Sequence, residues 1–195
     1  SEMFGVNENN LNENSSFNPN SPYAEAKLIN HLRVKEIREN FDWPIYSGIM
    51  FNHESEFRNR SYLVMKIISS VKKILSDPNE RLALGSLEYI RDWTYASDTV
   101  NAVYQVTTKG ESFDYVIGSG KGNSIKDMVS YIFEYFDLDW NNYIEINQDL
   151  LREGDPLRIV SDPSKLKNEF NWETKTTFHQ MLDICIKGFN NLDSA

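Results

Sequence analysis

Cysteine is nearly absent from this chain of 195 residues, whose single thiol is Cys185. One cysteine excludes an internal disulfide framework, so we expect a reducing compartment, the cytoplasm. The surrounding stretch 181–186 is mostly apolar. This context favours a buried, unreactive thiol over a nucleophile.

Excess basic charge and long apolar runs are also lacking. The chain has 20 Lys and Arg against 29 Asp and Glu, a formal charge of −9, which argues against a general nucleic-acid binder. No apolar run approaches the length of a membrane span, so we expect no membrane partner. The histidines His31, His53 and His179 are scattered, and the sequence therefore predicts no metal site.

Apolar residues are nevertheless frequent enough for a folded domain. They make up 40% of the chain and aromatic residues 13%, which is typical of a globular protein. Strand-like and helix-like segments follow one another and predict an α/β chain. Strands are expected within 45–51, 82–84, 89–95, 115–117, 143–146 and 157–160, and helices over 22–41, 60–75, 98–106, 125–136, 163–170 and 177–189.

The longest expected helix, over residues 22–41, carries a pair of residues with chemical potential. Pro22 suits the first helical position, and Ser21 before it suits the N-cap. Tyr23 and Lys27 are four residues apart and so share one face of the helix. An ammonium favours the phenolate form of a nearby tyrosine, which can then take a proton from a sugar hydroxyl while a hydride leaves the same carbon. Because Tyr-x-x-x-Lys is common, an ordinary surface pair is the alternative.

The glycine-rich stretch 118–124 does not have the spacing of a phosphate-binding loop. Such a loop needs four residues between its first glycine and Gly-Lys, and Ser or Thr directly after the lysine. Here Gly118 lies two residues before Gly120, and another glycine follows the lysine. A strand-to-helix turn explains the stretch, with Ser124 and Asp127 spaced as a capping box.

Several motifs occur in one order along the chain. They are Ser1-Glu2-Met3-Phe4-Gly5, Ser21-Pro22-Tyr23-x-x-x-Lys27, Gly48-Ile-Met-Phe-Asn-His-Glu-Ser55, Leu84-Gly85-Ser-Leu-x-x-x-Arg91-Asp92-Trp93, Arg152 with Asp162-Pro-Ser-Lys165, and Asn171-Trp172. This arrangement resembles the GDP-mannose 4,6-dehydratase family of extended short-chain dehydrogenase/reductases, over nearly the whole chain. The Asn-His-Glu-Ser and Arg-Asp-Trp motifs make the resemblance specific within that superfamily.

The resemblance implies a Rossmann-like parallel-sheet domain and a smaller α/β domain that binds a sugar nucleotide. The Gly-rich cofactor fingerprint of such proteins does not occur in this sequence, so we expect the N-terminal cofactor half to be missing. Residues 1–55 would be a remnant of the NADP-binding domain, with residues 1–5 at the end of a strand. Residues 56–195 would mainly form the sugar-nucleotide domain, with some segments returning to the Rossmann domain. By itself such a fragment is expected to be inactive.

The resemblance also implies a reaction, the NADP-dependent conversion of GDP-mannose to GDP-4-keto-6-deoxymannose. Tyr23 would deprotonate the sugar 4-hydroxyl, and Lys27 would support it and bind the cofactor ribose. Glu2 would remove the C5 proton and assist loss of the C6 hydroxyl as water, after which a hydride returns to C6. Without the resemblance, Glu2 is more typical of a solvated carboxylate.

The other implied site residues contact the ligands. His53 and Arg58 match NADP contacts, in addition to Tyr23 and Lys27. Arg91 and Arg152 match contacts to the substrate diphosphate, for which the forked donors of guanidinium are suited. Asn52 is expected on the substrate side.

Some of these residues also have purely structural interpretations. His53 can cap a strand end, Arg58 can be a solvated loop charge, and Arg91 can pair with its neighbour Asp92. Trp93 and Trp172 are expected in the core, and Asp98 at the cap of a helix.

The sequence departs from the family pattern at two places. Glu56 stands where the family commonly has Pro, and Thr94-Tyr95 follow Trp93 where the family has Gly-His. Neither position belongs to the expected reaction centre, but both leave the substrate open. The alternatives are another epimerase, reductase or dehydratase of the superfamily that acts on a related sugar nucleotide, or an inactive sugar-nucleotide-binding fragment.

The family associates through the helix that bears the Tyr–Lys pair. This implies a homodimer or tetramer, and it implies that much of the apolar surface of helix 22–41 is uncovered in a single chain.

Overall fold

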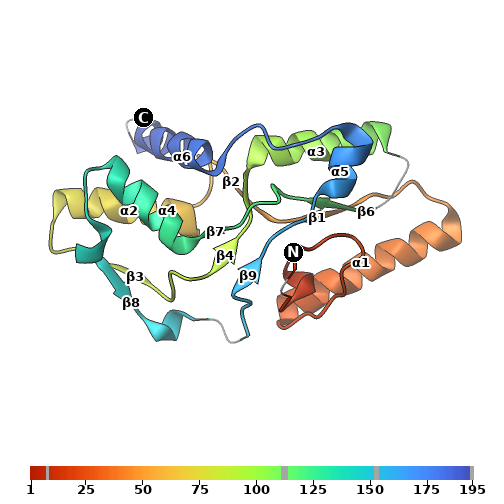
Figure 1. Cartoon of the computed structure of the whole chain (residues 1–195), viewed down its shortest axis with the longest axis horizontal. Coiled ribbons are helices and arrows are strands. Elements are labelled where there is room, and N and C mark those ends of the chain that lie inside the picture. The colour runs from red at the N-terminus through yellow and green to blue at the C-terminus, as the bar shows by residue number, and fades with distance from the viewer. Residues whose placement is uncertain (8, 111–113, 152–153, 194–195) are drawn as a thin grey trace.

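The computed structural model describes residues 1–7, 9–110, 114–151 and 154–193 (Figure 1). The helices are α1 Pro22–Phe41, α2 Leu63–Ser76, α3 Ala96–Lys109, α4 Ile125–Tyr135, α5 Ser164–Phe170 and α6 Phe178–Asp193. The strands are β1 Ser47–Met50, β2 Asn52–Glu54, β3 Leu82–Leu84, β4 Ile90–Arg91, β5 Trp93–Tyr95, β6 Asp114–Ile117, β7 Asn123–Ser124, β8 Ile144–Ile146 and β9 Arg158–Ile159. Three short 3-10 helices span Glu2–Phe4, Trp140–Asn142 and Gln148–Leu150.

Parallel pairing dominates the described strands, as the expected α/β fold requires. β1 pairs with β6, β2 with β5 and β3 with β8, all in parallel. β4 lies between β9, which is parallel to it, and β7, which is antiparallel. Only the buried Phe51 separates β1 from β2, and its N–H donates to the carbonyl of Ile117, so one continuous path serves two partners. The carboxyl end of this path carries the Asn-His-Glu motif.

The helix starts follow the local signals that the sequence contains. Ser21 Oγ accepts a hydrogen bond from the Ala24 N–H (3.1 Å), which confirms the expected N-cap of α1. The capping box of Ser124 and Asp127 is present at the start of α4. Thr177 Oγ1 accepts from the Gln180 N–H (3.3 Å) just before α6. The cap at Ser21 and the capping box at Ser124 were predicted from chemistry within one turn of chain, and both predictions are confirmed.

The expectation that residues 1–5 end a strand is wrong, because this segment turns into the 3-10 helix Glu2–Phe4. Gly5 follows with a φ of 62°, a backbone conformation that favours glycine. A Cβ at Gly5 would also lie 1.9 Å from the carbonyl oxygen of Asn18, which requires a residue without a side chain. The turn brings Met3 and Phe4 into the core and leaves Glu2 half-buried.

Two aspartates behave differently from what their positions predict. The single strand expected over 89–95 is split into β4 and β5 at Asp92, whose carboxylate accepts bonds from other loops. Asp98 does not cap α3, which already begins at Ala96. Its carboxylate instead accepts hydrogen bonds from the N–H groups of Lys175 and Thr176, before α6. Both roles depend on partners distant in sequence, so local spacing could not reveal them.

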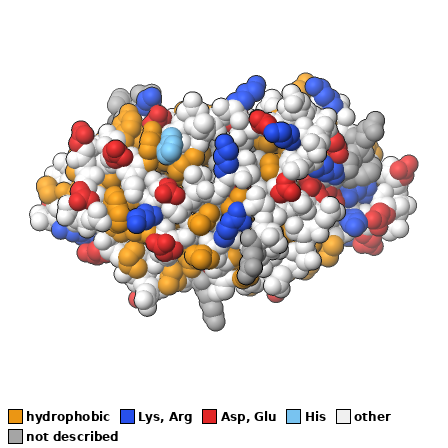
Figure 2. All heavy atoms as spheres, viewed as in Figure 1, with side chains coloured by type: hydrophobic (Ala, Val, Ile, Leu, Met, Phe, Trp, Pro, Cys, Tyr) orange, Lys and Arg blue, Asp and Glu red, His pale blue; other side chains and the backbone are white. Residues whose placement is uncertain are grey.

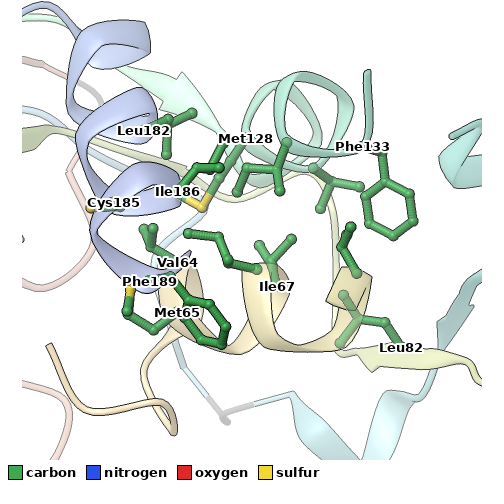
Figure 3. Packing of buried hydrophobic residues seen from close by; sticks show 14 of the residues in the cluster. Val64, Met65, Ile67, Leu82, Met128, Phe133, Leu182, Cys185, Ile186 and Phe189 are labelled. Atoms are coloured by element: carbon green, nitrogen blue, oxygen red, sulfur yellow. The ribbon is translucent and has the colours of Figure 1, made fainter. Parts of the chain in front are cut away.

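The largest buried cluster lies between α2, α4 and α6 (Figure 3). In Figure 3, Val64, Met65 and Ile67 of α2 face Met128 and Phe133 of α4 and Leu182 and Ile186 of α6. The thiol of Cys185 belongs to this cluster, and burial raises its pKa to about 12. The expectation that Cys185 is buried is therefore confirmed. Two smaller clusters surround β1 and β6, and Trp93 and Trp172 are both buried, as expected.

Helix α1 lies away from this cluster, at the other end of the molecule (Figure 1). Ala24 and His31 are its only buried residues. Ile29 is 66% exposed and Leu32 is 51% exposed, so the expectation of uncovered apolar surface on this helix is confirmed for the single chain. Polar contacts attach it instead: His31 Nδ1 lies 2.9 Å from Ser47 Oγ, and Arg38 forms a 2.9 Å ion pair with Asp114.

The surface has no simple charge pattern on the face drawn in Figure 2, where acidic and basic side chains are interspersed. No helix among the described residues combines the length and the apolar character that crossing a bilayer demands. The domain boundary expected after residue 55 stays a prediction.

Candidate functional site

A cavity of about 910 Å³ brings the expected site residues together. It is bounded by α1, the β1–β2 path, the start of α2 and strand β4. The cavity is lined by Glu2, Tyr23, Lys27, Asn52, His53, Arg58 and Arg91. The remaining expected residue, Arg152, lies outside the described residues. A volume of this order accommodates a large organic ligand.

The Tyr–Lys pair occupies the first turns of α1, at the edge of the cavity. Tyr23 is 61% exposed, and Lys27 is exposed as well. The Lys27 Nζ atom lies 5.4 Å from the centroid of the Tyr23 ring, on the shared helix face that the spacing predicts. The phenol is therefore accessible to a ligand and lies close to a cation, as proton transfer with a bound molecule requires.

Glu2 lines the same cavity from the short helix Glu2–Phe4. Burial of Met3 and Phe4 fixes this helix, which packs against α1. The terminal amino group of Ser1 donates a 2.9 Å hydrogen bond to the carbonyl of Met50 in β1. The carboxylate of Glu2 and the phenol of Tyr23, which come from two separate motifs, thus line the same cavity.

Strand β2 supplies Asn52 and His53. Their register opposite Trp93 and Thr94 of β5 sets where the two side chains lie. The His53 Nδ1 atom lies 3.1 Å from the carbonyl oxygen of Phe51, at the join between β1 and β2. This contact is the strand-end role foreseen for His53, and the same ring also lines the cavity.

Arg91 is buried in β4 and is paired, but not with Asp92. Its Nη2 donates to Asp155 Oδ1 at 2.7 Å, and its Nη1 donates to the carbonyls of Ile90 (2.9 Å) and Leu157 (3.3 Å). The ion pair with Asp92 that sequence adjacency suggests is therefore wrong. Neighbouring residues of a strand point to opposite faces, so Arg91 lines the cavity while Asp92 faces away from it.

Asp92 ties together three stretches of chain behind the cavity wall. Its carboxylate accepts hydrogen bonds from the N–H groups of Ser119 (2.9 Å), Gly120 (3.0 Å) and Ser161 (3.2 Å), and from both serine hydroxyls. A Cβ at Gly118 would lie 2.3 Å from Ser161 Oγ. The glycine-rich stretch therefore wraps a protein carboxylate, which agrees with its interpretation as a structural turn. We call this arrangement the Asp92 clasp.

Glu54 is the main cavity residue that sequence reasoning did not single out. It lies at the end of β2, is 5% exposed and lines the cavity. Its Oε2 is 3.4 Å from Arg58 Nε, but neither atom has a hydrogen-bond partner. Burial raises the pKa of Glu54 to about 7, although the nearby Arg58 charge lowers it. In the sequence, the only indication of Glu54 was its place as the third residue of the Asn-His-Glu-Ser motif.

Tyr62, Tyr89 and Asp155 also line the cavity and were not foreseen, because their sequence surroundings do not mark them. Among the residues that the structure describes, no three His, Cys, Asp or Glu side chains are grouped to hold a metal ion.

The two departures from the family pattern contact each other. The Tyr95 hydroxyl donates to the Glu56 carboxylate, 3.1 Å from Oε2 and 3.3 Å from Oε1. This bond joins the loop after β2 to the end of β5. A Cβ at Gly188 of α6 would lie 2.2 Å from Glu56 Cβ, so the helix approaches the same loop closely.

Comparison with known proteins is consistent with this site. The family model described as GDP-mannose 4,6 dehydratase matches residues 1–185. "GDP-mannose 4,6 dehydratase 2" of Arabidopsis thaliana is 31% identical over 186 residues, which cover 95% of this chain and 50% of that protein. The chain thus spans about half the length of this curated relative.

Solved structures share the fold. The dTDP-glucose 4,6-dehydratase of Bacillus anthracis, in complex with NAD, has a TM-score of 0.89 at 22% identity and covers 99% of this chain and 60% of its own. RMD from Pseudomonas aeruginosa, complexed with NADPH, has a TM-score of 0.87 at 17% identity, covering 98% and 64%. These likenesses show that the chain shares the α/β fold of those structures. Since the family model extends over all seven described site residues, the chain belongs to the GDP-mannose 4,6-dehydratase family.

Proposed function

We propose that this chain provides the proton-transfer residues and the sugar-nucleotide site of an NADP-dependent GDP-mannose 4,6-dehydratase. The observation that carries the proposal is the cavity shared by Glu2, Tyr23, Lys27 and Arg91, in a chain matched by the family model over residues 1–185. Dehydration at C5 and C6 needs a phenol, a carboxylate and an anion-binding group around one sugar, and this cavity has all three.

The residues present fit a nicotinamide dinucleotide. Lys27, His53 and Arg58 line the cavity, and the buried Arg58 Nε has no hydrogen-bond partner. Two cations and an imidazole suit the phosphate and ribose groups of such a cofactor. NAD is present in one structural neighbour and NADPH in another; we assign NADP to this chain on the family resemblance. When bound, the nicotinamide supplies the hydride acceptor for C4 and later the hydride donor for C6.

Tyr23 begins the chemistry by accepting the proton of the sugar 4-hydroxyl at its phenolate oxygen. Lys27 supplies a positive charge on the same helix face, with its Nζ 5.4 Å from the centroid of the Tyr23 ring. Loss of this proton and of the C4 hydrogen as hydride leaves a ketone at C4.

Glu2 performs the next step. The C4 ketone acidifies the C5 hydrogen because the carbanion left behind is delocalised onto the ketone oxygen. The Glu2 carboxylate removes the C5 proton and passes it to the departing C6 hydroxyl, which leaves as water. The C5–C6 double bond that remains would take a hydride at C6, supplied by the cofactor when bound, and at C5 a proton equivalent to the one that Tyr23 took from the 4-hydroxyl.

Arg91 holds the diphosphate of the substrate. Its Nη atoms already donate to Asp155 and to two carbonyls, which fixes the guanidinium plane at the cavity wall. A guanidinium has five N–H donors, so it can serve an anion as well. We assign Asn52 to the sugar and Arg152 to the second diphosphate contact.

We further propose that α1 mediates assembly into a homodimer or tetramer. The exposed Ile29 and Leu32 on this helix are the supporting observation. Analytical ultracentrifugation of the chain and of an Ile29→Glu variant tests this. We expect self-association in the unmodified chain only, and equal sedimentation of the two would contradict it.

The reaction is tested in a chain that also contains the Gly-rich cofactor half of the family. Tyr23→Phe should abolish reduction of the nicotinamide on addition of GDP-mannose. Glu2→Gln should allow C4 oxidation, seen as reduced-nicotinamide absorbance, and block water loss, seen by mass spectrometry. Full dehydration by Glu2→Gln would reject the assigned role.

Substrate class is tested on the present chain by titration with GDP-mannose, UDP-glucose and dTDP-glucose. Preferential binding of GDP-mannose supports the proposal. Preference for another nucleotide favours a different enzyme of the superfamily, the possibility that the Glu56–Tyr95 departure raises.

A further inference from the structure

The starting observation is a buried charge whose cost is not offset by hydrogen bonds. Glu54 is 5% exposed, and its Oε2 and the Arg58 Nε have no hydrogen-bond partner although they are 3.4 Å apart. Removing one member of a buried pair is costly, but the pair itself contributes little to stability when its geometry is poor. A hydrophobic residue would serve the packing of this position better. Such arrangements are concentrated at functional sites.

The ionisable groups around Glu54 indicate that Arg58 is the cation that interacts with its carboxylate. From α6 the neighbouring titratable group is the protonated thiol of Cys185. From β5, Tyr95 is hydrogen-bonded to Glu56 on the loop after β2.

The remaining ionisable groups near β2 have other partners. Asp98 of α3 accepts the N–H groups of residues 175 and 176, and His53 contacts the carbonyl of Phe51. Burial raises the pKa of Glu54, and among the described residues Arg58 is the group whose charge lowers it.

The guanidinium of Arg58 is held on two sides. Nε faces Glu54, and the guanidinium carbon lies 3.8 Å from the centroid of the Tyr62 ring, a close cation–π contact. The side chain remains 33% exposed at the cavity. The two terminal nitrogens carry four further N–H donors, which an anion in the cavity can accept.

The loop that carries Arg58 is itself anchored from behind. Glu56, two residues after Glu54, bonds to Tyr95 and packs against Gly188. Glu56 is not among the residues that line the cavity. It therefore provides a matched control: a carboxylate of the same loop with a purely structural contact.

We propose that Glu54 is a positioning residue that holds the Arg58 guanidinium at the cavity wall so that its terminal N–H groups bind a phosphate or diphosphate group of the ligand. This rests on the proposed function, which places a phosphorylated ligand in the cavity. The ionised carboxylate is the form that attracts the guanidinium. With a pKa of about 7, Glu54 changes charge near neutral pH, so Arg58 should be best positioned above that pH.

The experiment follows the Arg58 Nε–H signal by NMR in the present chain, in Glu54→Gln and in Glu56→Gln. We expect a distinct, slowly exchanging signal in the unmodified chain and in Glu56→Gln, and an averaged one in Glu54→Gln. In the unmodified chain the signal should lose its distinct shift as the pH falls from about 8 to 6. This last measurement needs no variant, so it tests the proposal even if Glu54→Gln folds poorly.

Anion binding is probed with inorganic pyrophosphate and with NADP. Either probe should shift the Arg58 signal, and Glu54→Gln should bind about tenfold more weakly than Glu56→Gln. Affinity should rise with pH more steeply in the unmodified chain than in Glu54→Gln, a comparison that removes the titration of the phosphate itself. A repulsive role for Glu54 predicts the opposite difference.

An Arg58 signal that is indifferent to Glu54→Gln and to pH overturns the proposal, as does failure of both probes to shift it. Failure of the proposed function looks different: Arg58 responds to Glu54 and to pyrophosphate, but GDP-mannose does not bind preferentially.

Discussion

Helices α1 and α2 differ in what surrounds them, although each is a regular helix of at least 14 residues. Six side chains of α2 are buried, and they pack against α4 and α6. Two residues of α1 are buried, and the helix is attached through the Ser21 cap, the His31–Ser47 contact and the Arg38–Asp114 ion pair. Apolar packing stabilises one helix, and polar contacts position the other.

The difference shows that the largest buried cluster and the exposed Tyr23 and Lys27 side chains occupy different parts of this molecule. Two of the groups proposed for proton transfer, Tyr23 and Lys27, lie on α1, where a ligand can reach them, and none of the seven described site residues belongs to the largest buried cluster. A helix that must present Tyr23 to a ligand cannot bury that face. The consequence is that substitutions in the two helices should affect different measurements.

The largest expected effect comes from the core. Phe133→Ala, at a fully buried position of α4, should lower the free energy of unfolding by about 3–5 kcal/mol, because it leaves a cavity in the largest buried cluster. Leu32→Ala on α1 should change it by less than about 0.5 kcal/mol at protein concentrations below those at which the chain self-associates, since this side chain is half exposed in the single chain. Urea denaturation measures both. Similar losses for the two variants would show that α1 is packed in solution.

The next effect concerns pH and Glu54, which lies between the two regions. Its pKa is about 7 in the folded chain against 4.5 as the reference value, so the folded state retains a proton that the unfolded chain has lost. This contribution to stability is complete below pH 4.5 and is lost as the pH rises through 7. The loss is on the order of 3 kcal/mol.

Glu54→Gln should therefore remove that slope and be more stable, relative to the unmodified chain, at pH 8 than at pH 4.5. Thermal unfolding over this range measures it. Parallel curves for the two proteins would show that Glu54 has an ordinary pKa.

Removing either helix cap should cost about 1 kcal/mol, but the loss should be local for one helix and global for the other. Ser21→Ala should increase amide hydrogen exchange in the first turns of α1 alone, because little tertiary packing couples this end to the core. Ser124→Ala should lower global stability, because α4 belongs to the main cluster. Global destabilisation by Ser21→Ala would remove the distinction between the regions.

The smallest expected effect is the response of α1 to acid. Burial lowers the pKa of His31 below its usual 6.5, so the unfolded chain takes up a proton before the folded one does. Stability from this residue is present above pH 6.5 and declines as the pH falls below it. Exchange of α1 amides should rise on acidification, and His31→Asn should reduce that dependence. An α1 whose exchange is independent of pH would contradict this.

Sequence reasoning succeeded where the determinants were local. The cap at Ser21, the capping box at Ser124 and the Tyr–Lys spacing depend on groups within one or two helical turns. Motif order also placed seven expected site residues around one cavity, although their roles remain proposals.

Sequence reasoning failed where the actual partner of a side chain is distant in sequence. Arg91 forms its ion pair with Asp155 and not with the adjacent Asp92, because successive side chains of a strand point to opposite faces. Tyr95 and Glu56 are 39 positions apart, so their hydrogen bond follows only from the parallel pairing of β2 and β5.

The Asp92 clasp has a practical consequence for studying this protein. Three amide protons, those of Ser119, Gly120 and Ser161, point at one buried carboxylate directly beneath the arginine at the ligand side. Amides bonded to a charged acceptor have unusual chemical shifts and exchange slowly. The amide resonances of Ser119, Gly120 and Ser161 can therefore report whether a ligand is bound on the opposite, Arg91 side of the strand, without an added reporter group.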